Sequence, residues 1–164
     1  MKKKILFNRR QCFILAASLL ITIPSRAPAK KSFANIHVVK DPGCGCCDAW
    51  IQILKEAGFN VSTENRSNRL LAQFKIEKKI PKDMVACHTA LVGKYFIEGH
   101  VPVKEIKHLI TKNIDALGLS VPGMPYGSPG MGPEKDREAY EVFIIKPDGT
   151  SEVFTRYHQS GKLV

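Results

Sequence analysis

The stretch that decides the fold of this chain is Asp41-Pro42-Gly43-Cys44-Gly45-Cys46-Cys47. It separates a short run of strand-forming residues, 36–39, from residues 49–57, where apolar side chains recur at helical spacing. Pro42 and Gly43 interrupt regular structure, so the cysteines are expected at a turn from a strand into a helix. Three thiols within four residues at such a turn are seldom there for packing. We therefore expect this turn to carry chemistry.

The spacing of the thiols is compatible with two kinds of chemistry. Cys44 and Cys47 have the C-x-x-C spacing of redox-active pairs, and the amino end of a helix lowers the pKa of a thiol by stabilising the thiolate. A thiolate is both the nucleophile in disulfide exchange and the form that binds metal. Exchange needs only two sulfurs, whereas a metal site benefits from the third, Cys46. A purely structural disulfide scaffold is a third interpretation, but adjacent cysteines such as Cys46 and Cys47 bridge only with strain.

Further soft ligands follow later in the chain. Cys87-His88 stands at the start of a predicted strand and adds a fourth thiol and an imidazole. Met124 and Met131 occur in matching Gly-Met contexts within a Gly/Pro-rich segment, although each could equally fill a gap in the core. Thiolate and thioether donors together favour Cu(I) over zinc and over hard cations. The predicted metal ligands are Cys44, Cys46, Cys47, Cys87, His88, Met124 and Met131.

The other histidines receive weaker interpretations. His100 precedes a helix that begins with a proline, so we expect it only to cap or pack. His37, His108 and His158 have no motif around them and are treated as background.

The order of predicted elements favours an α/β fold. Strands are expected at residues 36–40, 60–63, 87–92 and 95–98, and helices at 48–57, at 65–79 and after Pro102. This β-α-β-α-β-β-α order is that of a thioredoxin-like domain, a mixed sheet flanked by helices, over residues 30–117. Residues 118–164 are expected to form an extension packed on the same domain. Its Gly/Pro-rich part, 118–133, should be neither helix nor strand, and residues 141–145 and 151–156 should form a hairpin.

The first 29 residues read as a secretory signal peptide. A basic start is followed by the apolar residues 12–23 and by Ala27-Pro28-Ala29, after which cleavage is expected. Arg9-Arg10 raises the twin-arginine route, but Cys12 stands where that signal usually has a large apolar residue, so the sequence favours Sec export. A periplasmic protein without a stable membrane anchor is the expected product, in a compartment that allows disulfides.

Export changes the charge argument. The full chain carries 25 Lys and Arg against 15 Asp and Glu, a formal charge of +10. Residues 1–29 hold six basic and no acidic residues, which leaves 19 against 15, or +4, in the exported protein. A basic cluster, interpreted as a solvated helix face, has no interleaved aromatic residues, so nucleic acid is not an expected partner. Its members are Lys75, Lys78, Lys79 and Lys82.

Several blocks of the chain resemble a bacterial family called domain of unknown function 411, which includes CopG-type proteins of copper-resistance clusters. The blocks are Cys44-Gly45-Cys46-Cys47, Cys87-His88-Thr89-Ala90, Glu98-Gly99-His100-Val101-Pro102, Val121-Pro122-Gly123-Met124-Pro125 and Gly127-Ser128-Pro129-Gly130-Met131. The similarity extends over about residues 35–157.

The resemblance implies a periplasmic, thioredoxin-like domain that binds one or more copper ions at the C-x-C-C turn and cycles them between Cu(I) and Cu(II). It implies Cys44, Cys46 and Cys47 as the principal ligands, with Cys87, His88, Met124 and Met131 on the other matching blocks. Other periplasmic copper-handling proteins are the implied partners. The alternative is a thiol-disulfide oxidoreductase that uses Cys44 and Cys47.

Overall fold

The computed structural model describes residues 32–160. The predicted signal peptide and its cleavage site lie outside the described residues. The strands are β1 (Asn35–Lys40), β2 (Asn60–Asn65), β3 (His88–Val92), β4 (Tyr95–Glu98), β5 (Gly118–Ser120), β6 (Tyr140–Ile145) and β7 (Ser151–Tyr157). The helices are α1 (Gly45–Glu56), α2 (Asn68–Glu77) and α3 (Val103–Lys112), with 3₁₀ turns at Lys82–Met84 and Glu134–Asp136.

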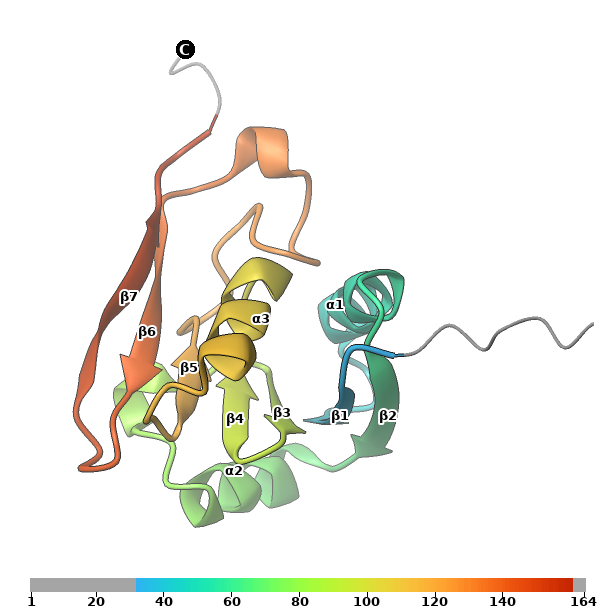
Figure 1. Ribbon diagram of the computed structural model, residues 1–164. Helices are drawn as coiled ribbons and strands as arrows, with labels where there is room; N and C mark the ends of the chain where they lie inside the picture. Colours follow the sequence, from blue (N-terminus) through green and yellow to red (C-terminus); the bar gives the residue numbers. More distant parts are fainter. Residues whose placement is uncertain (1–31, 161–164) are drawn as a thin grey trace, which may run out of the picture. The chain divides into compact units, whose positions relative to one another are not determined.

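All seven strands form one mixed sheet in the order β2-β1-β3-β4-β5-β6-β7 (Figure 1). β1 runs parallel to β2 and antiparallel to β3, and β4 runs antiparallel to β3 and parallel to β5. β6 and β7 extend the sheet beyond β5 as an antiparallel hairpin. The α/β fold class with a mixed sheet is therefore confirmed, and β1-α1-β2-α2-β3-β4-α3 is the order on which the thioredoxin-like prediction rests.

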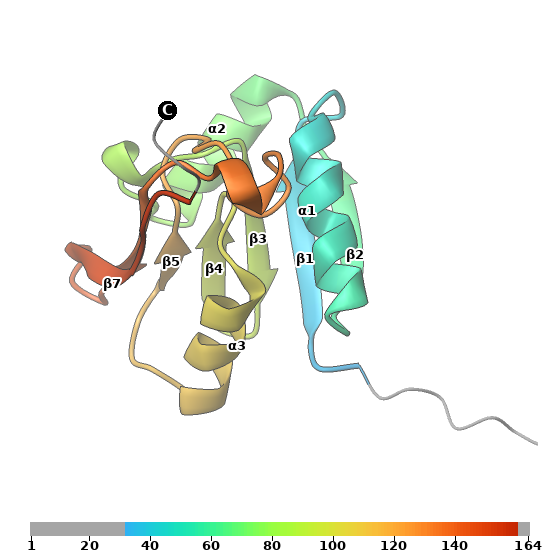
Figure 2. The same cartoon turned by 90° about the horizontal axis from the view of Figure 1, so that it is seen from above.

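The helices cover both faces of the sheet. α1 and α3 lie on one face and α2 on the other (Figures 1 and 2). The larger core cluster packs between the sheet and helices α1 and α3, and Val39 meets Leu71 and Phe74 of α2 on the opposite face. Since β1 and β3 are covered on both faces, their residues are mostly apolar and buried.

Local sequence explains where α1 begins and ends. Cys44 is its N-cap, and the helix buries Cys47, Trp50, Ile51 and Leu54, which recur at the spacing of one helical face. Gly58, with φ of +91°, follows the last turn in the left-handed region, which only glycine adopts without strain. The predicted helix is therefore confirmed, and the thiol turn lies at its amino end.

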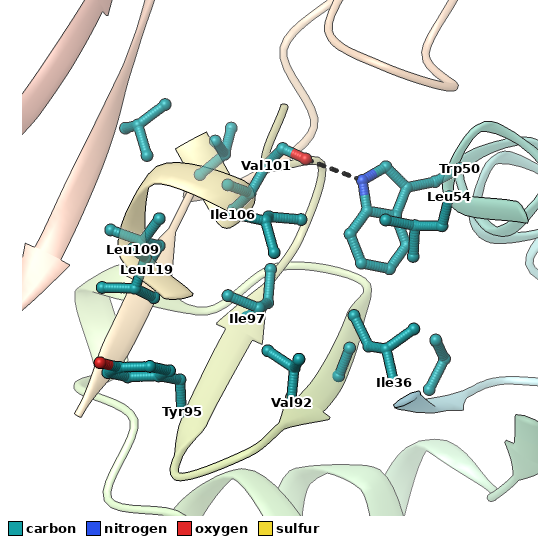
Figure 3. Packing of buried hydrophobic residues seen from close by; sticks show 14 of the residues in the cluster. Ile36, Trp50, Leu54, Val92, Tyr95, Ile97, Val101, Ile106, Leu109 and Leu119 are labelled. Carbon is teal, nitrogen blue, oxygen red and sulfur yellow. Dashed lines mark hydrogen bonds between the residues drawn. The ribbon is translucent and has the colours of Figure 1, made fainter. Parts of the chain in front are cut away.

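The core contains one buried polar contact that joins α1 to the segment before α3. The indole nitrogen of Trp50 donates a hydrogen bond of 2.9 Å to the carbonyl of Val101 (Figure 3). Trp50 is fully buried, so this bond satisfies a group that would otherwise lose its water without replacement. The bond ties the helix that carries the thiols to the chain next to His100.

Two predictions about strands are corrected by the structure. β2 continues to Asn65 because it stays paired with β1 through the register Lys40↔Asn65, so α2 begins only at Asn68. Residues 118–120, expected to be irregular, form the strand β5 between β4 and β6. A Cβ atom on Gly118 would lie 2.1 Å from the carbonyl oxygen of Phe96, so here glycine permits close strand pairing instead of breaking it.

Within residues 32–160, no helix combines the length and the apolar character needed to cross a membrane.

Replacing Leu54 by alanine tests the packing of α1 on the sheet. Leu54 is fully buried in the larger core cluster, and we expect Leu54→Ala to lower the free energy of unfolding by about 2–5 kcal/mol because it leaves a cavity. Urea denaturation followed by circular dichroism measures the change. Lys55→Ala, on the exposed face of the same helix, should change stability by less than about 0.5 kcal/mol. Equal losses in the two variants would contradict the assigned burial.

Candidate metal centre

The turn that carries the thiols is held by Asp41. The Asp41 side chain accepts a hydrogen bond of 2.8 Å from the backbone N–H of Gly43, and its carbonyl accepts one from the N–H of Cys44. Such a turn directs the chain from β1 straight into α1. Cys46 and Cys47 then occupy the first turn of the helix, where the backbone N–H groups and the helix dipole favour thiolates.

The three thiols of the turn differ in state. Cys44 and Cys47 form a disulfide, with their Cα atoms 5.4 Å apart, and Cys47 is fully buried. Cys46 is a free thiol, and its sulfur lies 3.5 Å from that of Cys44. The structure thus joins the two cysteines with redox spacing and leaves the third, which disulfide exchange does not need, unpaired.

The fourth cysteine of the site comes from a distant part of the sequence. Cys87, a free thiol immediately before β3, places its sulfur 3.6 Å from that of Cys47. The sulfurs of Cys44, Cys46, Cys47 and Cys87 all lie within 4.8 Å of one another. The predicted meeting of the Cys87-His88 segment with the thiol turn is therefore observed.

Two imidazoles complete a second group around Cys87. The Cys87 sulfur lies 3.2 Å from Nδ1 of His88 and 3.2 Å from Nε2 of His100. These three side chains also present donor atoms within 4.8 Å of one another. Cys87 is therefore shared by a cluster of four sulfurs and a cluster of one sulfur and two imidazoles.

The protonation of the two histidines suits metal binding. Burial lowers the pKa of His88 well below its usual value, and burial also lowers the pKa of His100. Both rings are thus neutral near pH 7, the form in which histidine binds metal. Nδ1 of His100 lies 2.8 Å from the carbonyl oxygen of Pro129, to which it must donate. Nε2 of His100 therefore turns an unprotonated lone pair toward Cys87.

His88 has a buried nitrogen without a partner. Its Nε2 makes no hydrogen bond within residues 32–160, although the ring is fully buried between Trp50 and His100. A buried polar atom of this kind is uncommon in a folded protein.

Cys87 is held as a neutral thiol in the absence of metal. Burial, together with the neighbouring Cys46, raises the pKa of Cys87 to about 12. The protonated sulfur can donate to Nε2 of His100. A metal ion that binds Cys87 must therefore displace its proton.

The Gly/Pro-rich segment returns to the site at two places. Gly130 packs against the first turns of α1 so closely that a Cβ atom there would lie 2.9 Å from the carbonyl oxygen of Cys46. The N–H of Gly123 donates to the carbonyl of Val85, and Gly123 pairs with Ala86 next to Cys87. Met131 and Met124 directly follow these two glycines. The Met124 side chain is 56% exposed and that of Met131 is partly buried, and their role as ligands stays a prediction.

A pocket of about 530 Å³ opens beside the sulfurs. Cys44 and Cys87 lie on its wall, and most of the remaining lining is apolar and comes from α2 and the loop after it, including Leu71, Ile80 and Val85. This pocket leaves an approach to the two sulfurs from the face of the sheet that α2 covers.

Two residues at this site were misjudged from the sequence. His100, expected only to cap or pack, contacts Cys87, and the signal that could have identified it is its place in the Glu98-Gly99-His100-Val101-Pro102 block. Lys75, interpreted as part of a solvated helix face, is buried and pairs with the fully buried Glu98, whereas Lys78, Lys79 and Lys82 are exposed. Charge spacing alone does not separate Lys75 from its neighbours, because the pairing depends on a strand 23 residues away.

The donor set fits a thiophilic metal. Four sulfurs and two neutral imidazoles are soft or intermediate ligands, and no carboxylate joins either ligand group within residues 32–160. Such ligands select copper or zinc over magnesium or calcium. Reduction of the Cys44–Cys47 disulfide would make all four sulfurs available.

Comparisons with known proteins agree with this picture. The family model described as "Protein of unknown function, DUF411" matches residues 84–131, which include Cys87, His88, His100, Met124 and Met131. No curated protein matches the chain. A solved structure of copper resistance protein copG, form 1, is 36% identical with a TM-score of 0.71, and form 2 is 37% identical with a TM-score of 0.70. Each match covers 76% of this chain and 98% of the solved one.

Since more than a third of the aligned residues are identical over nearly the whole length of the copG chains, this protein belongs to the DUF411 family with them.

Proposed function

We propose that this protein is an exported copper-binding protein of copper resistance, which holds copper at the thiol turn. The observation that carries the proposal is the convergence of four cysteine sulfurs within 4.8 Å, one of which also contacts two neutral imidazoles. Similarity to the copper resistance protein copG points to copper among the thiophilic metals. The signal peptide predicted from residues 1–29 supports a periplasmic location, with Sec as the favoured route.

The proposed ligands have graded support. Cys46 and Cys87 are free thiols, and Cys44 and Cys47 become ligands once their disulfide is reduced. His88 and His100 offer neutral nitrogens beside Cys87. Met124 and Met131 are proposed as thioether ligands on the strength of the two glycine contacts that return their backbone to the site.

Copper, when bound, supplies a one-electron change between Cu(I) and Cu(II), and we propose that the protein uses it. Thiolates and thioethers favour Cu(I), whereas imidazoles also accept Cu(II). Cys87 lies between the two kinds of ligand, so both oxidation states would find donors without a large movement of the chain.

A thiol-disulfide oxidoreductase is the second candidate, and the Cys44–Cys47 disulfide at the start of α1 favours it. In that case a substrate thiolate would attack one sulfur of the disulfide and form a mixed disulfide. The other sulfur would leave as a thiolate that the helix amino end stabilises. This candidate gives no role to Cys46, His88 or His100.

Reduction of the disulfide should increase copper binding. We expect the protein reduced without oxygen to retain more Cu(I) per chain, and to hold it more tightly, than the oxidised protein, because reduction adds two thiols to the two already free. Titration with Cu(I) against a chromophoric Cu(I) chelator, with metal analysis of the gel-filtered product, measures both quantities. Failure of the reduced protein to compete for Cu(I) would contradict the proposed function.

Cys46→Ser separates the two candidates. The variant should lose Cu(I) affinity by at least about tenfold, a change of about 1.4 kcal/mol, because one of four clustered sulfurs is gone. Cys44 and Cys47 should still form and exchange their disulfide, as followed by reduction with dithiothreitol. If Cu(I) affinity and stoichiometry were those of the parent protein, the oxidoreductase would become the better interpretation.

His100→Ala tests the ligand that the sequence did not single out. Removing Nε2, which lies 3.2 Å from the Cys87 sulfur, should change the absorption spectrum of the Cu(II)-loaded protein and weaken Cu(II) binding. The control is His108→Ala, since His108 is exposed and packs against Phe154, away from Cys87. Identical spectra for His100→Ala, the control and the parent protein would exclude His100 as a ligand.

A further inference from the structure

We propose that the buried ion pair of Lys75 and Glu98 positions Cys87 and His88 beside Cys47 and His100, an inference that rests on the proposed function of this site. Within residues 32–160, no hydrogen bond or ion pair joins Lys75 or Glu98 to the side chain of a proposed metal ligand. Both act through the backbone and the Thr89 side chain that flank the Cys87-His88 pair.

The Glu98 carboxylate holds the chain on both sides of Cys87-His88. One oxygen, Oε1, accepts a hydrogen bond of 2.7 Å from the backbone N–H of Ala86, the residue before Cys87. The other, Oε2, accepts a bond of 2.6 Å from the hydroxyl of Thr89, the residue after His88. Two bonds to a single carboxylate thus fix the two ends of a four-residue segment.

Lys75 fixes the carboxylate in turn. Its ammonium group donates to Oε1 of Glu98 and, over 2.9 Å, to the hydroxyl of Thr89. Each polar atom of the network therefore has a partner: the Thr89 hydroxyl accepts from Lys75 and donates to Glu98. Lys75 reaches this position from α2 and lines the same pocket as Cys44 and Cys87.

Fold stability alone is a weak reason for this pair. Glu98 is fully buried and Lys75 is 7% exposed, and removing two charges from water costs several kcal/mol per ion. Apolar residues of similar volume at such positions are often neutral or stabilising. Most of the surrounding lining is already apolar, so hydrophobic side chains would fit there. What they could not supply is the pair of directional bonds to Ala86 and Thr89.

The segment needs such a restraint because strand pairing holds it incompletely. Regular pairing between β1 and β3 extends only to Lys40↔His88, so Cys87 lies just beyond the last residue that pairs with β1. The residues before it form the loop that follows the 3₁₀ turn Lys82–Met84. Without the carboxylate, the position of the Cys87 sulfur, 3.6 Å from Cys47, would depend on the end of β3 and on the isolated bridge between Ala86 and Gly123.

The double variant Lys75→Met/Glu98→Leu tests the inference, because it removes both charges and leaves no unpaired ion. Urea denaturation should show a folded protein of nearly unchanged stability. Its Cu(I) affinity should fall about 10–100-fold, as for residues that orient metal ligands without touching the metal. In the metal-free protein, alkylation of Cys87, located by peptide mass spectrometry, should become faster than in the parent protein.

Two further variants complete the experiment. Lys78→Met makes the same change at an exposed lysine just after α2 and should leave affinity and alkylation unchanged. Thr89→Val replaces the hydroxyl by a methyl group of similar shape, so it keeps the test valid if the double variant does not fold. It should lower Cu(I) affinity severalfold.

The outcomes distinguish this inference from the proposed function. Parent-like Cu(I) affinity and parent-like Cys87 alkylation in the double variant would overturn the positioning role, as would parent-like affinity of Thr89→Val if the double variant fails to fold. If the parent protein itself bound no copper, the proposed function would fail. The alkylation rate of Cys87 in the metal-free variants would still decide whether the ion pair positions the thiol.

Discussion

The antiparallel register of β1 and β3 is the constraint on which the rest of the site depends. Lys40, the last residue of β1, pairs with His88, the first residue of β3. The next residues on either side are Asp41, which begins the thiol turn, and Cys87. Because paired strands lie about 5 Å apart, this register brings Cys87, from one half of the domain, near the thiols of the turn that follows β1. A shift of one residue would turn His88 to the opposite face of the sheet.

The C-terminal part of the chain contributes to the site through backbone contacts. Glycine at position 130 lets the Gly/Pro-rich segment, 118–133, pack against the first turns of α1. The carbonyl of Pro129 sets the tautomer of His100. The same part of the chain is anchored at a distance: Tyr157 of β7 donates to the buried carboxylate of Glu105 on α3. The site therefore draws on segments from β1 to the loop before β6.

The polar and charged groups around the sulfurs are arranged in two layers. The groups nearest to the three thiols of the turn are neutral: the two imidazoles and the protonated thiol of Cys87. Further out lie paired charges on both faces of the sheet, Lys75 with Glu98 on the face that α2 covers and the buried Lys40 with Asp48 of α1 on the other. A metal ion that displaces protons from thiols would thus meet a site whose own charges are already compensated.

Much of the fold and part of the site follow from the sequence, because they depend on local patterns. The periodicity of Trp50, Ile51 and Leu54 determines α1, and the cysteines at its start follow from the turn residues before it. The element order and the α/β class were predictable for the same reason. The strand that begins at Gly118 was not predictable. Glycine occurs both in tightly paired strands and in irregular loops, and the sequence does not distinguish the two until the neighbouring strand is known.

What the amino-acid sequence determined by itself is the kind of donor group: sulfur and imidazole side chains, with three thiols at the amino end of a helix. Only the tertiary structure decided which of them meet, since the contacts of Cys87 with Cys47 and His100, and of Lys75 with Glu98, span 13 to 40 residues of sequence. Local periodicity carries no information about such distances, which are set by strand register and by the packing of helices on the two faces of the sheet.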